Sequence, residues 1–316
     1  MEGRIRIGVS TCLLGQPVRF DGSHKHDRYL TGTLAEYLEF VPVCPEVEAG
    51  FPVPRESMRL VGDPDRPRLV TTRSGVDHTE RMAAWAEKRV RELEAENLCG
   101  FIFKSDSPSS GLERVKVYND KGMAEKKGVG IFARAFTRHF PLLPVEEEGR
   151  LNDAKLRETF IEQIFTLKRW REMLALPAAM KHLVDFHACH KLLVLAHSPV
   201  HAKLMGKLVA EGKRRSYREL CADYERQLLA ALRMKTTVKK NLNVLQHIMG
   251  YFKRQLTADE KQELLDILDQ YRREIVPLIV PITLLNHYVR KYDEPYLKQQ
   301  LYLNPHPLAL KLRNHA

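Results

Sequence analysis

The first 150 residues alternate short apolar runs with amphipathic stretches, a pattern that predicts an α/β unit. Three of the apolar runs are rich in β-branched or aromatic residues, and we expect buried parallel strands at 5–10, 40–43 and 100–103. Helical periodicity separates these runs near 31–38 and 77–97. A strand-like VKVY at 115–118 and a helix at about 128–138 complete the unit. The predicted fold of this half is a Rossmann-like parallel sheet with crossover helices.

The pattern changes after the segment 141–151, which contains two prolines and three consecutive glutamates. We expect this segment to separate a first domain, residues 1–148, from a second, residues 149–316. Beyond it every periodic stretch is helical and no convincing strand remains. Helices are expected at about 153–175, 179–195, 199–211, 216–234, 238–255 and 258–275. The second domain is therefore predicted to be all-α.

Two of the predicted helices begin with capping signals. Asp77 precedes one apolar stripe and has Glu80 three residues on, while Thr257 and Glu260 have the spacing of a reciprocal capping box. We expect both pairs to fix the start of a helix.

The overall composition, 44% hydrophobic and 29% charged, is that of an ordinary globular protein. Neither a secretory signal nor an apolar run of membrane-spanning length is apparent, so a cytoplasmic location is expected. The chain has five cysteines, an odd number that is widely spaced, which argues against a disulfide framework.

The charge is divided unevenly between the two halves. Residues 1–150 contain 23 Lys+Arg and 23 Asp+Glu, so the whole net charge of +11 belongs to residues 151–316. A field of this kind attracts polyanions, and nucleic acid is the usual cytoplasmic polyanion. The alternative is a solvated basic face without a dedicated partner. The residues we expect to contact RNA are Lys213, Arg214, Arg215, Arg218, Lys239 and Lys240.

Reactive or turn-forming residues follow each of the three predicted strands of the first half. Cys12 follows the first strand, Cys44 the second, and the serine-rich stretch 105–111 the third. Because the carboxyl ends of parallel strands meet at one edge of a sheet, we expect Cys12 and Cys44 to face one crevice. Neither cysteine belongs to a CxxC pair, so a thioredoxin-like site or a zinc ribbon is poorly supported.

Three strings carry a resemblance to a known family: STCLLGQPVRFDG (10–22), VPVCPE (41–46) and KSDSPSSG (104–111). In this order they resemble the bacterial thiouracil desulfidases. The second half, with DFHACHKLLVLAHSP (185–199) and LNVLQHIMGYFKRQL (242–256), is similar to the YbgA-like domain fused to them in tRNA thiouridine desulfidases.

The resemblance implies a [4Fe–4S] cluster with three cysteine ligands and one iron left open to substrate. Cys12 and Cys44 match two ligands, Glu46 matches a carboxylate that activates water, and Ser107 matches a hydroxyl for proton transfer. The implied reaction is a non-redox hydrolysis that turns 4-thiouridine in tRNA into uridine and releases sulfide.

The sequence departs from the family pattern at the third ligand, where Ser110 stands in place of a cysteine. A hydroxyl is a hard donor and suits such an iron poorly. Three explanations remain open: a deliberate cysteine-to-serine replacement, a natural centre that uses Ser110 or Cys99, or a natural member without a cluster. Each predicts low cluster occupancy and weak activity in this chain.

Two other functions remain as alternatives. The protein could bind thiolated RNA without turnover, which the serine favours, or it could act on free thiouracil, with the helical half serving oligomerisation. Several histidines gather at 182–201, but no zinc-binding HExxH pattern accompanies them. We therefore favour structural or RNA-facing roles for these histidines over a metal site.

Overall fold

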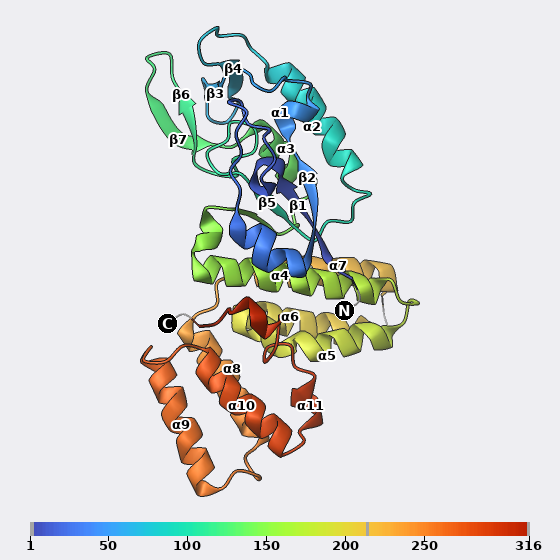
Figure 1. Cartoon of the computed structure of the whole chain (residues 1–316). Coiled ribbons are helices and arrows are strands. Elements are labelled where there is room, and N and C mark those ends of the chain that lie inside the picture. The colour runs from blue at the N-terminus through green and yellow to red at the C-terminus, as the bar shows by residue number, and fades with distance from the viewer. Residues whose placement is uncertain (1–2, 213–214, 315–316) are drawn as a thin grey trace. The chain divides into compact units, whose positions relative to one another are not determined.

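The computed structural model of the protein describes residues 3–212 and 215–314. The chain divides into two compact units, 1–160 and 161–316 (Figure 1). Helix α4 (Ala154–Leu174) begins in the first unit and continues into the second. The α/β class of the first unit and the helical class of the second are as predicted.

A four-stranded parallel sheet forms the centre of the first unit, and its strand order is β2–β1–β5–β8. Its members are β1 (Ile5–Ser10), β2 (Leu38–Val43), β5 (Phe101–Phe103) and β8 (Val145–Glu147). The strands β1 and β2 pair in register from Ile5 with Leu38 to Ser10 with Val43, and β5 pairs with both β1 and β8. The three predicted parallel strands are confirmed, although β2 begins two residues earlier than expected.

The order of this sheet sets the place of the crevice. The chain passes from β1 to β2 on one side and later returns to β5 on the other side of β1. Ligands of open parallel sheets bind beyond the carboxyl ends of the strands at such a reversal. The loops that follow β1, β2 and β5 all start from this edge.

A second sheet, of order β4–β3–β6–β7, was not predicted. It consists of β3 (Met58–Val61), β4 (Arg68–Thr71), β6 (Val115–Tyr118) and β7 (Ala124–Gly128). Of these strands only β6 has a clear strand pattern. The others are short or, like the exposed AEKKG of β7, too polar for an apolar alternation to indicate them.

The segment 141–151, which contains the predicted boundary, includes strand β8 as the last strand of the first unit. Two of its three glutamates, Glu146 and Glu147, are buried. Their carboxylates have hydrogen-bond partners inside the first unit, so this run of like charges belongs to the packed unit.

Two helices cover this unit: α2 (Thr79–Glu92) and α3 (Ile131–His139), which pack against each other. The predicted cap of α2 is wrong. The Asp77 carboxylate accepts hydrogen bonds from the amide and the hydroxyl of Thr79, and His78 occupies the N-cap position. The helix expected at 31–38 is replaced by a π-helical turn, η2 (Tyr29–Thr33), and a 3-10 turn, η3 (Leu34–Glu36). The Thr-Gly-Thr sequence there disfavours a regular α-helix.

Phe101, Phe103, Phe132 and Phe136 are fully buried and form the aromatic core of the first unit, with ring centroids 4.2–6.1 Å apart. Gly8 on β1 permits this packing, because a Cβ atom there would lie 2.2 Å from the Phe101 ring.

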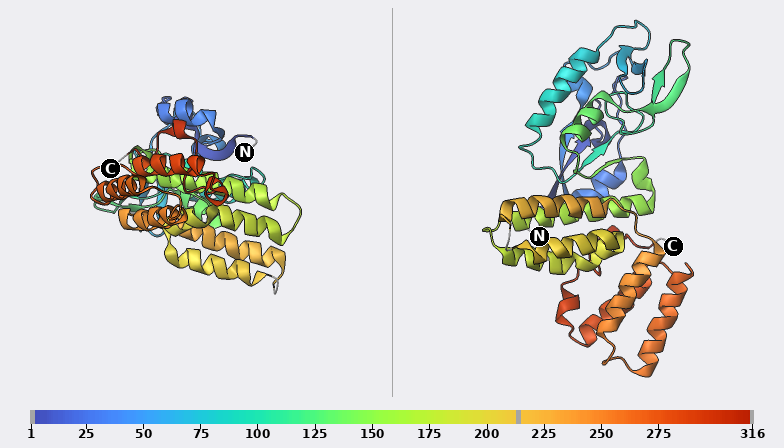
Figure 2. Two further views of the ribbon diagram at one scale, coloured as in Figure 1. Left: turned by 90° about the horizontal axis from the view of Figure 1, so that it is seen from below. Right: turned by 180° about the vertical axis from the view of Figure 1, so that it is seen from behind.

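The second unit is helical throughout its described residues. Its helices after α4 are α5 (Met180–His197), α6 (Pro199–Ala210), α7 (Tyr217–Leu232), α8 (Val238–Tyr251), α9 (Ala258–Arg272), α10 (Ile279–Lys291) and α11 (Pro295–Lys298). Helices α5, α6 and α7 lie side by side, α8, α9 and α10 pack together, and α8 also packs against α5 (Figure 2). Trp170, Phe186 and Tyr224 pack together in its core. The capping box of Thr257 and Glu260 at the start of α9 is confirmed.

Candidate metal centre and active site

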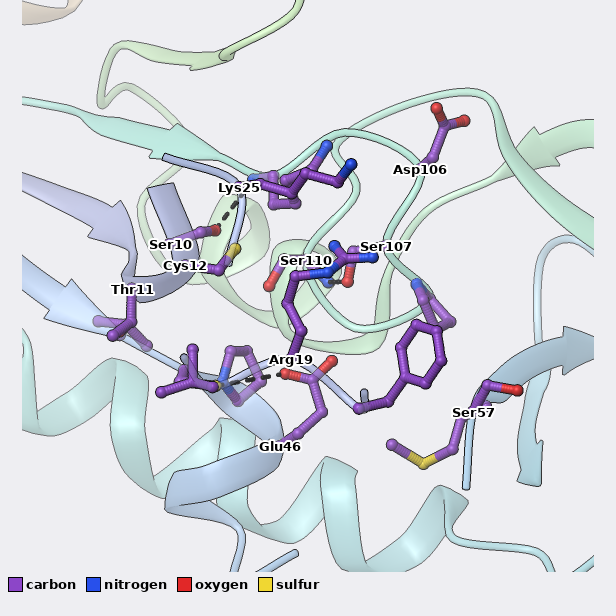
Figure 3. A pocket seen from close by; sticks show the side chains of 18 of the residues that line it. Ser10, Thr11, Cys12, Arg19, Lys25, Glu46, Ser57, Asp106, Ser107 and Ser110 are labelled. Atoms are coloured by element: carbon purple, nitrogen blue, oxygen red, sulfur yellow. Dashed lines mark hydrogen bonds between the residues drawn. The ribbon is translucent and has the colours of Figure 1, made fainter. Parts of the chain in front are cut away.

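The loops after β1, β2 and β5 enclose a cavity of about 460 Å³. Its lining includes all five residues that the sequence singled out for chemistry: Cys12, Cys44, Glu46, Ser107 and Ser110. Figure 3 shows Cys12, Glu46, Ser107 and Ser110 around this cavity. Residues up to 98 positions apart in the chain therefore meet at the edge where the sheet reverses its order.

Cys12 lies in a tight 3-10 turn, η1 (Thr11–Leu14), directly after β1. Gly15 ends this turn with a φ of 85°, a left-handed conformation that favours glycine. The Cys12 carbonyl accepts hydrogen bonds from the amides of Gly15 and Lys25, at 3.3 and 2.9 Å. The backbone of Cys12 is thus fixed from both sides, and its thiol is left to face the cavity.

Cys44 lies at the N-cap of the short helix α1 (Pro45–Glu48). Its amide donates to the Glu48 carboxylate at 2.9 Å, and its thiol lies 3.6 Å from Oε2 of Glu46. The single turn of α1 brings the carboxylate of Glu46 back toward the thiol two residues before it.

Both thiols are buried, with 9% of Cys12 and 8% of Cys44 exposed. Burial, reinforced by the negative charge of Glu46, raises the pKa of Cys12 to about 11 and that of Cys44 to about 12. The nearby charges of Lys104 and Arg19 oppose the rise in the pKa of Cys12, and the charge of Arg55 opposes the rise in the pKa of Cys44. The two thiols line the same cavity, where the charge of Glu46 acts on both.

A chain of hydroxyl groups connects the serine-rich loop to Glu46. The Ser110 amide donates to Oγ of Ser107 at 3.1 Å, and the hydroxyls of Ser107 and Ser109 lie 3.0 Å apart. The Ser109 hydroxyl donates to Oε1 of Glu46. Because Ser107 already accepts from an amide and Ser109 donates to a carboxylate, the Ser107 hydroxyl donates to Ser109. The two residues expected to act on protons are thus coupled through a third.

Ser109 is fully buried and was not predicted as a functional residue. It occupies the same SPSSG string as Ser107 and Ser110, but no spacing rule distinguishes its hydroxyl from theirs. Arg55 was missed as well: its guanidinium lies 3.8 Å from Oε2 of Glu46 and donates to the Val18 carbonyl at 3.1 Å. Arg55 lies nine residues after Glu46, and no motif at that spacing indicates that the two side chains meet.

The carbonyl groups of the serine-rich loop dock on the first turn of α3. The amides of Gly130, Ile131 and Phe132 donate to the carbonyls of Gly111, Pro108 and Ser109, at 2.8, 3.2 and 2.9 Å. A Cβ atom on Gly130 would lie 2.5 Å from the Ser109 carbonyl. This close approach fixes the loop on the side away from the cavity.

The sequence model of the family described as 2-thiouracil desulfurase matches residues 7–148. An uncharacterized protein of Bacillus subtilis, YbbK, is 34% identical over 110 residues, which cover 33% of this chain and 72% of YbbK. The chain belongs to the 2-thiouracil desulfurase family. A solved structure titled "[4Fe-4S]-dependent thiouracil desulfidase TudS" is 32% identical and covers 49% of this chain and 99% of its own, with a TM-score of 0.40. At this TM-score the membership rests on sequence.

The second half of this desulfurase-family chain has relatives of its own. The model described as a protein of unknown function, DUF1722, matches residues 191–307. The uncharacterized protein YbgA of Escherichia coli is 27% identical over 165 residues, which cover 52% of this chain and 98% of YbgA.

Of the three side chains expected to bind an iron–sulfur cluster, two are suitable ligands and one is not. Cys12 and Cys44 offer soft thiol sulfur, whereas Ser110, 3% exposed at the same cavity, offers only oxygen. Among the described residues, no cluster of three or more His, Cys, Asp or Glu side chains is arranged to bind a metal ion. Among the described residues that line this cavity there is no third cysteine, so a third thiolate ligand is not supplied at position 110.

Cys99 is not a replacement for that ligand. It is 2% exposed, its amide bonds to the Arg6 carbonyl, and it precedes β5, whereas Ser110 lies in the loop after β5. Cys99 does not line the cavity.

The basic residues of the second unit differ in their surroundings. Lys213 and Arg214 lie outside the described residues. Arg218 and Lys239 are exposed, and Arg215 pairs with Asp223. The Lys240 ammonium donates to the carbonyls of His197 and Lys235, both at 2.7 Å, so it stabilises the end of α5.

In the described part of the chain no helix is long and apolar enough to cross a bilayer.

Proposed function

We propose that this protein is a desulfidase that converts 4-thiouridine in tRNA to uridine and releases sulfide. The family gives the class of base, a thiolated uracil. The observation that carries the proposal is the cavity in which two buried thiols, a carboxylate and a serine hydroxyl meet from three separate loops. Cys12, Cys44 and residue 110 are the proposed ligands of a [4Fe–4S] cluster.

When bound, such a cluster supplies one iron without a protein ligand as a Lewis acid for the thiocarbonyl sulfur. Glu46 removes a proton from the attacking water, whose oxygen bonds to the ring carbon that carries the sulfur. The carbon–sulfur bond then breaks, the ring keeps the oxygen, and sulfur leaves as hydrogen sulfide. Water and thiocarbonyl become carbonyl and hydrogen sulfide, so no electron donor is needed.

The side chains around Glu46 suit this role. Ser109 and Arg55 hold the two oxygens of the carboxylate, so Glu46 keeps one orientation in the cavity. Ser107 is joined to Ser109 and also lines the cavity, so a proton can pass between Glu46 and the leaving sulfur by way of hydroxyl groups.

The second unit supports tRNA as the substrate. All of the net charge of +11 lies in residues 151–316, and a surface of this kind binds the phosphate backbone without sequence preference. The target base belongs to a folded RNA, so it has to leave its stack to enter the cavity.

Ser110 favours a second candidate function, the binding of thiolated RNA without turnover. An oxygen donor at the third position lowers the retention of the cluster and leaves the cavity and the basic unit unchanged. Action on free thiouracil, the remaining alternative, requires no basic surface.

Turnover and binding separate these functions. Anaerobically reconstituted Ser110→Cys protein is expected to remove 4-thiouridine from bulk tRNA, and the present chain to do so weakly or not at all. Both proteins are expected to bind tRNA with an affinity that falls steeply as salt rises. Salt-dependent binding by both proteins without turnover would establish the second candidate. Turnover of free thiouracil alone, with no binding of tRNA, would establish the third.

A further inference from the structure

The triple glutamate at the end of β8 lies directly beside the serine-rich loop. Glu147 is buried, and its Oε1 accepts hydrogen bonds from the amides of Leu112 and Glu113, at 2.7 and 3.4 Å. Glu148 accepts from the Ser105 amide at 2.7 Å. The two carboxylates therefore bind the backbone of the loop at its two ends, on either side of residues 107–110.

The remaining bonds of Glu148 reinforce this contact. Its Oε1 accepts from the Ser105 hydroxyl at 2.8 Å and forms an ion pair with Lys104. The Lys104 amide in turn donates to the Ser10 hydroxyl at 2.9 Å, two residues before Cys12. Glu148 thus ties the start of the serine-rich loop to the strand end that carries a proposed ligand.

The loop is held on its opposite side as well. The amides at the start of α3 donate hydrogen bonds to the carbonyls of Pro108, Ser109 and Gly111. The loop amides therefore donate to the two carboxylates, and the loop carbonyls accept from α3. Buried backbone groups without a partner are costly, and this division satisfies groups on both sides of the loop. Only the Ser109 hydroxyl then connects the middle of the loop to Glu46.

We propose that Glu147 and Glu148 are positioning residues, which hold the loop so that Ser107 and residue 110 face Glu46 and the two thiols. Neither carboxylate lines the cavity, so each acts through the backbone it binds. The effect of these contacts on catalysis rests on the proposed function. The contacts of the two carboxylates with the loop backbone form a clamp, and this clamp can be measured without cluster or substrate.

The two glutamates use their oxygens differently, and this gives the clamp a specific signature. Both loop amides reach the same oxygen of Glu147, so a glutamine there keeps an acceptor in place. Glu148 uses both oxygens, one for the Ser105 amide and one for Lys104 and the Ser105 hydroxyl. A glutamine at 148 has to turn its NH₂ group toward one of these donors.

Hydrogen–deuterium exchange of residues 104–113 in the full chain tests the clamp. A buried amide that loses its acceptor destabilises the closed loop, so Glu147→Ala and Glu148→Ala are expected to speed exchange roughly ten- to hundredfold. Glu148→Gln is expected to resemble Glu148→Ala, whereas Glu147→Gln stays near the parent protein. The matched control is Glu87→Ala, which removes an exposed partner of Arg138 in the same unit. Its exchange in 104–113 is expected not to change.

Kinetics in the reconstituted Ser110→Cys protein tests the consequence. The two alanine variants and Glu148→Gln are expected to lower kcat at least tenfold with little change in KM, and Glu147→Gln to restore kcat. Unchanged exchange in both alanine variants overturns the clamp, and faster exchange with an unaltered kcat overturns the positioning role. If the Ser110→Cys parent itself has no turnover, the proposed function fails, and the exchange pattern still decides whether the carboxylates hold the loop.

Discussion

Glu46 in the first unit and Glu162 in the second are both withdrawn from solvent, and each has an arginine partner. Arg55 lies 3.8 Å from Glu46, while Arg313 lies 2.6 Å from Glu162. Glu162 is 2% exposed and also bonds to His197 at 3.0 Å. Glu46 instead borders a cavity of about 460 Å³ that it shares with two thiols.

The difference shows that burial and a charged partner do not distinguish a structural carboxylate from the one to which we assign the proposed catalytic role. Glu162 has close partners for both oxygens and lines none of the cavities described in the chain. It therefore stabilises the helical unit. Glu46 has a close partner, the Ser109 hydroxyl, for one oxygen only, and its other oxygen has longer contacts with Cys44 and Arg55 beside the cavity, where a substrate and water can reach it.

The largest expected difference between substitutions of Glu46 and Glu162 is in turnover. In the reconstituted Ser110→Cys protein, Glu46→Gln is expected to lower kcat about 10²- to 10⁴-fold, because general-base catalysis contributes on that order. Single-turnover assays of 4-thiouridine loss measure the change. Glu162→Gln is the control, and an equal loss of turnover in both variants would contradict the assignment of Glu46.

The second effect is on stability. Glu162→Ala leaves the Arg313 guanidinium and His197 in the core without this carboxylate, and is expected to lower the free energy of unfolding by about 3–5 kcal/mol. Denaturant unfolding followed by circular dichroism measures it. Glu46→Ala is expected to cost much less, and a reversed order would remove the distinction between the two sites.

A third prediction concerns pH. Burial opposes the ionisation of Glu162, but Arg313 and His197 outweigh it and lower its pKa to about 2 from the usual 4.5. Since the folded pKa is the lower one, the contribution is fully present above pH 4.5 and is lost as pH falls toward 2. The parent protein is expected to lose stability relative to Glu162→Gln over this window. Parallel acid titrations of the two proteins would refute the prediction.

The smallest effects come from two glycines. A Cβ atom on Gly130 would lie 2.5 Å from the Ser109 backbone, so Gly130→Ala is expected to destabilise the first unit by about 1–3 kcal/mol and to displace the site loop. Gly250 lies in α8 with open space around it, and Gly250→Ala is expected to stabilise the second unit by about 0.5–1 kcal/mol. Thermal unfolding of both variants measures the signs: a stabilising Gly130→Ala would contradict the packing at Gly130, and a destabilising Gly250→Ala would contradict the open space at Gly250.

The sequence could predict the elements whose apolar pattern is strong and the edge at which they meet. The strands before Cys12 and Cys44 are buried apolar runs, and the rule for parallel strand ends places both thiols at one cavity. The sheet containing β7 was not predictable in this way because its strands are short or polar. Ser109, Arg55 and Glu148 escaped because their roles depend on partners 63, 9 and 43 residues away, which no local pattern specifies.

The most direct test of the proposed metal centre is the iron content after anaerobic reconstitution. The Ser110→Cys protein is expected to bind about four iron atoms per chain, and the present chain far less. Adding Cys12→Ser to the Ser110→Cys protein is expected to abolish this gain, while adding Cys99→Ser leaves it intact. The account is contradicted if Ser110→Cys binds no more iron than the present chain, or if the gain depends on Cys99 and not on Cys12.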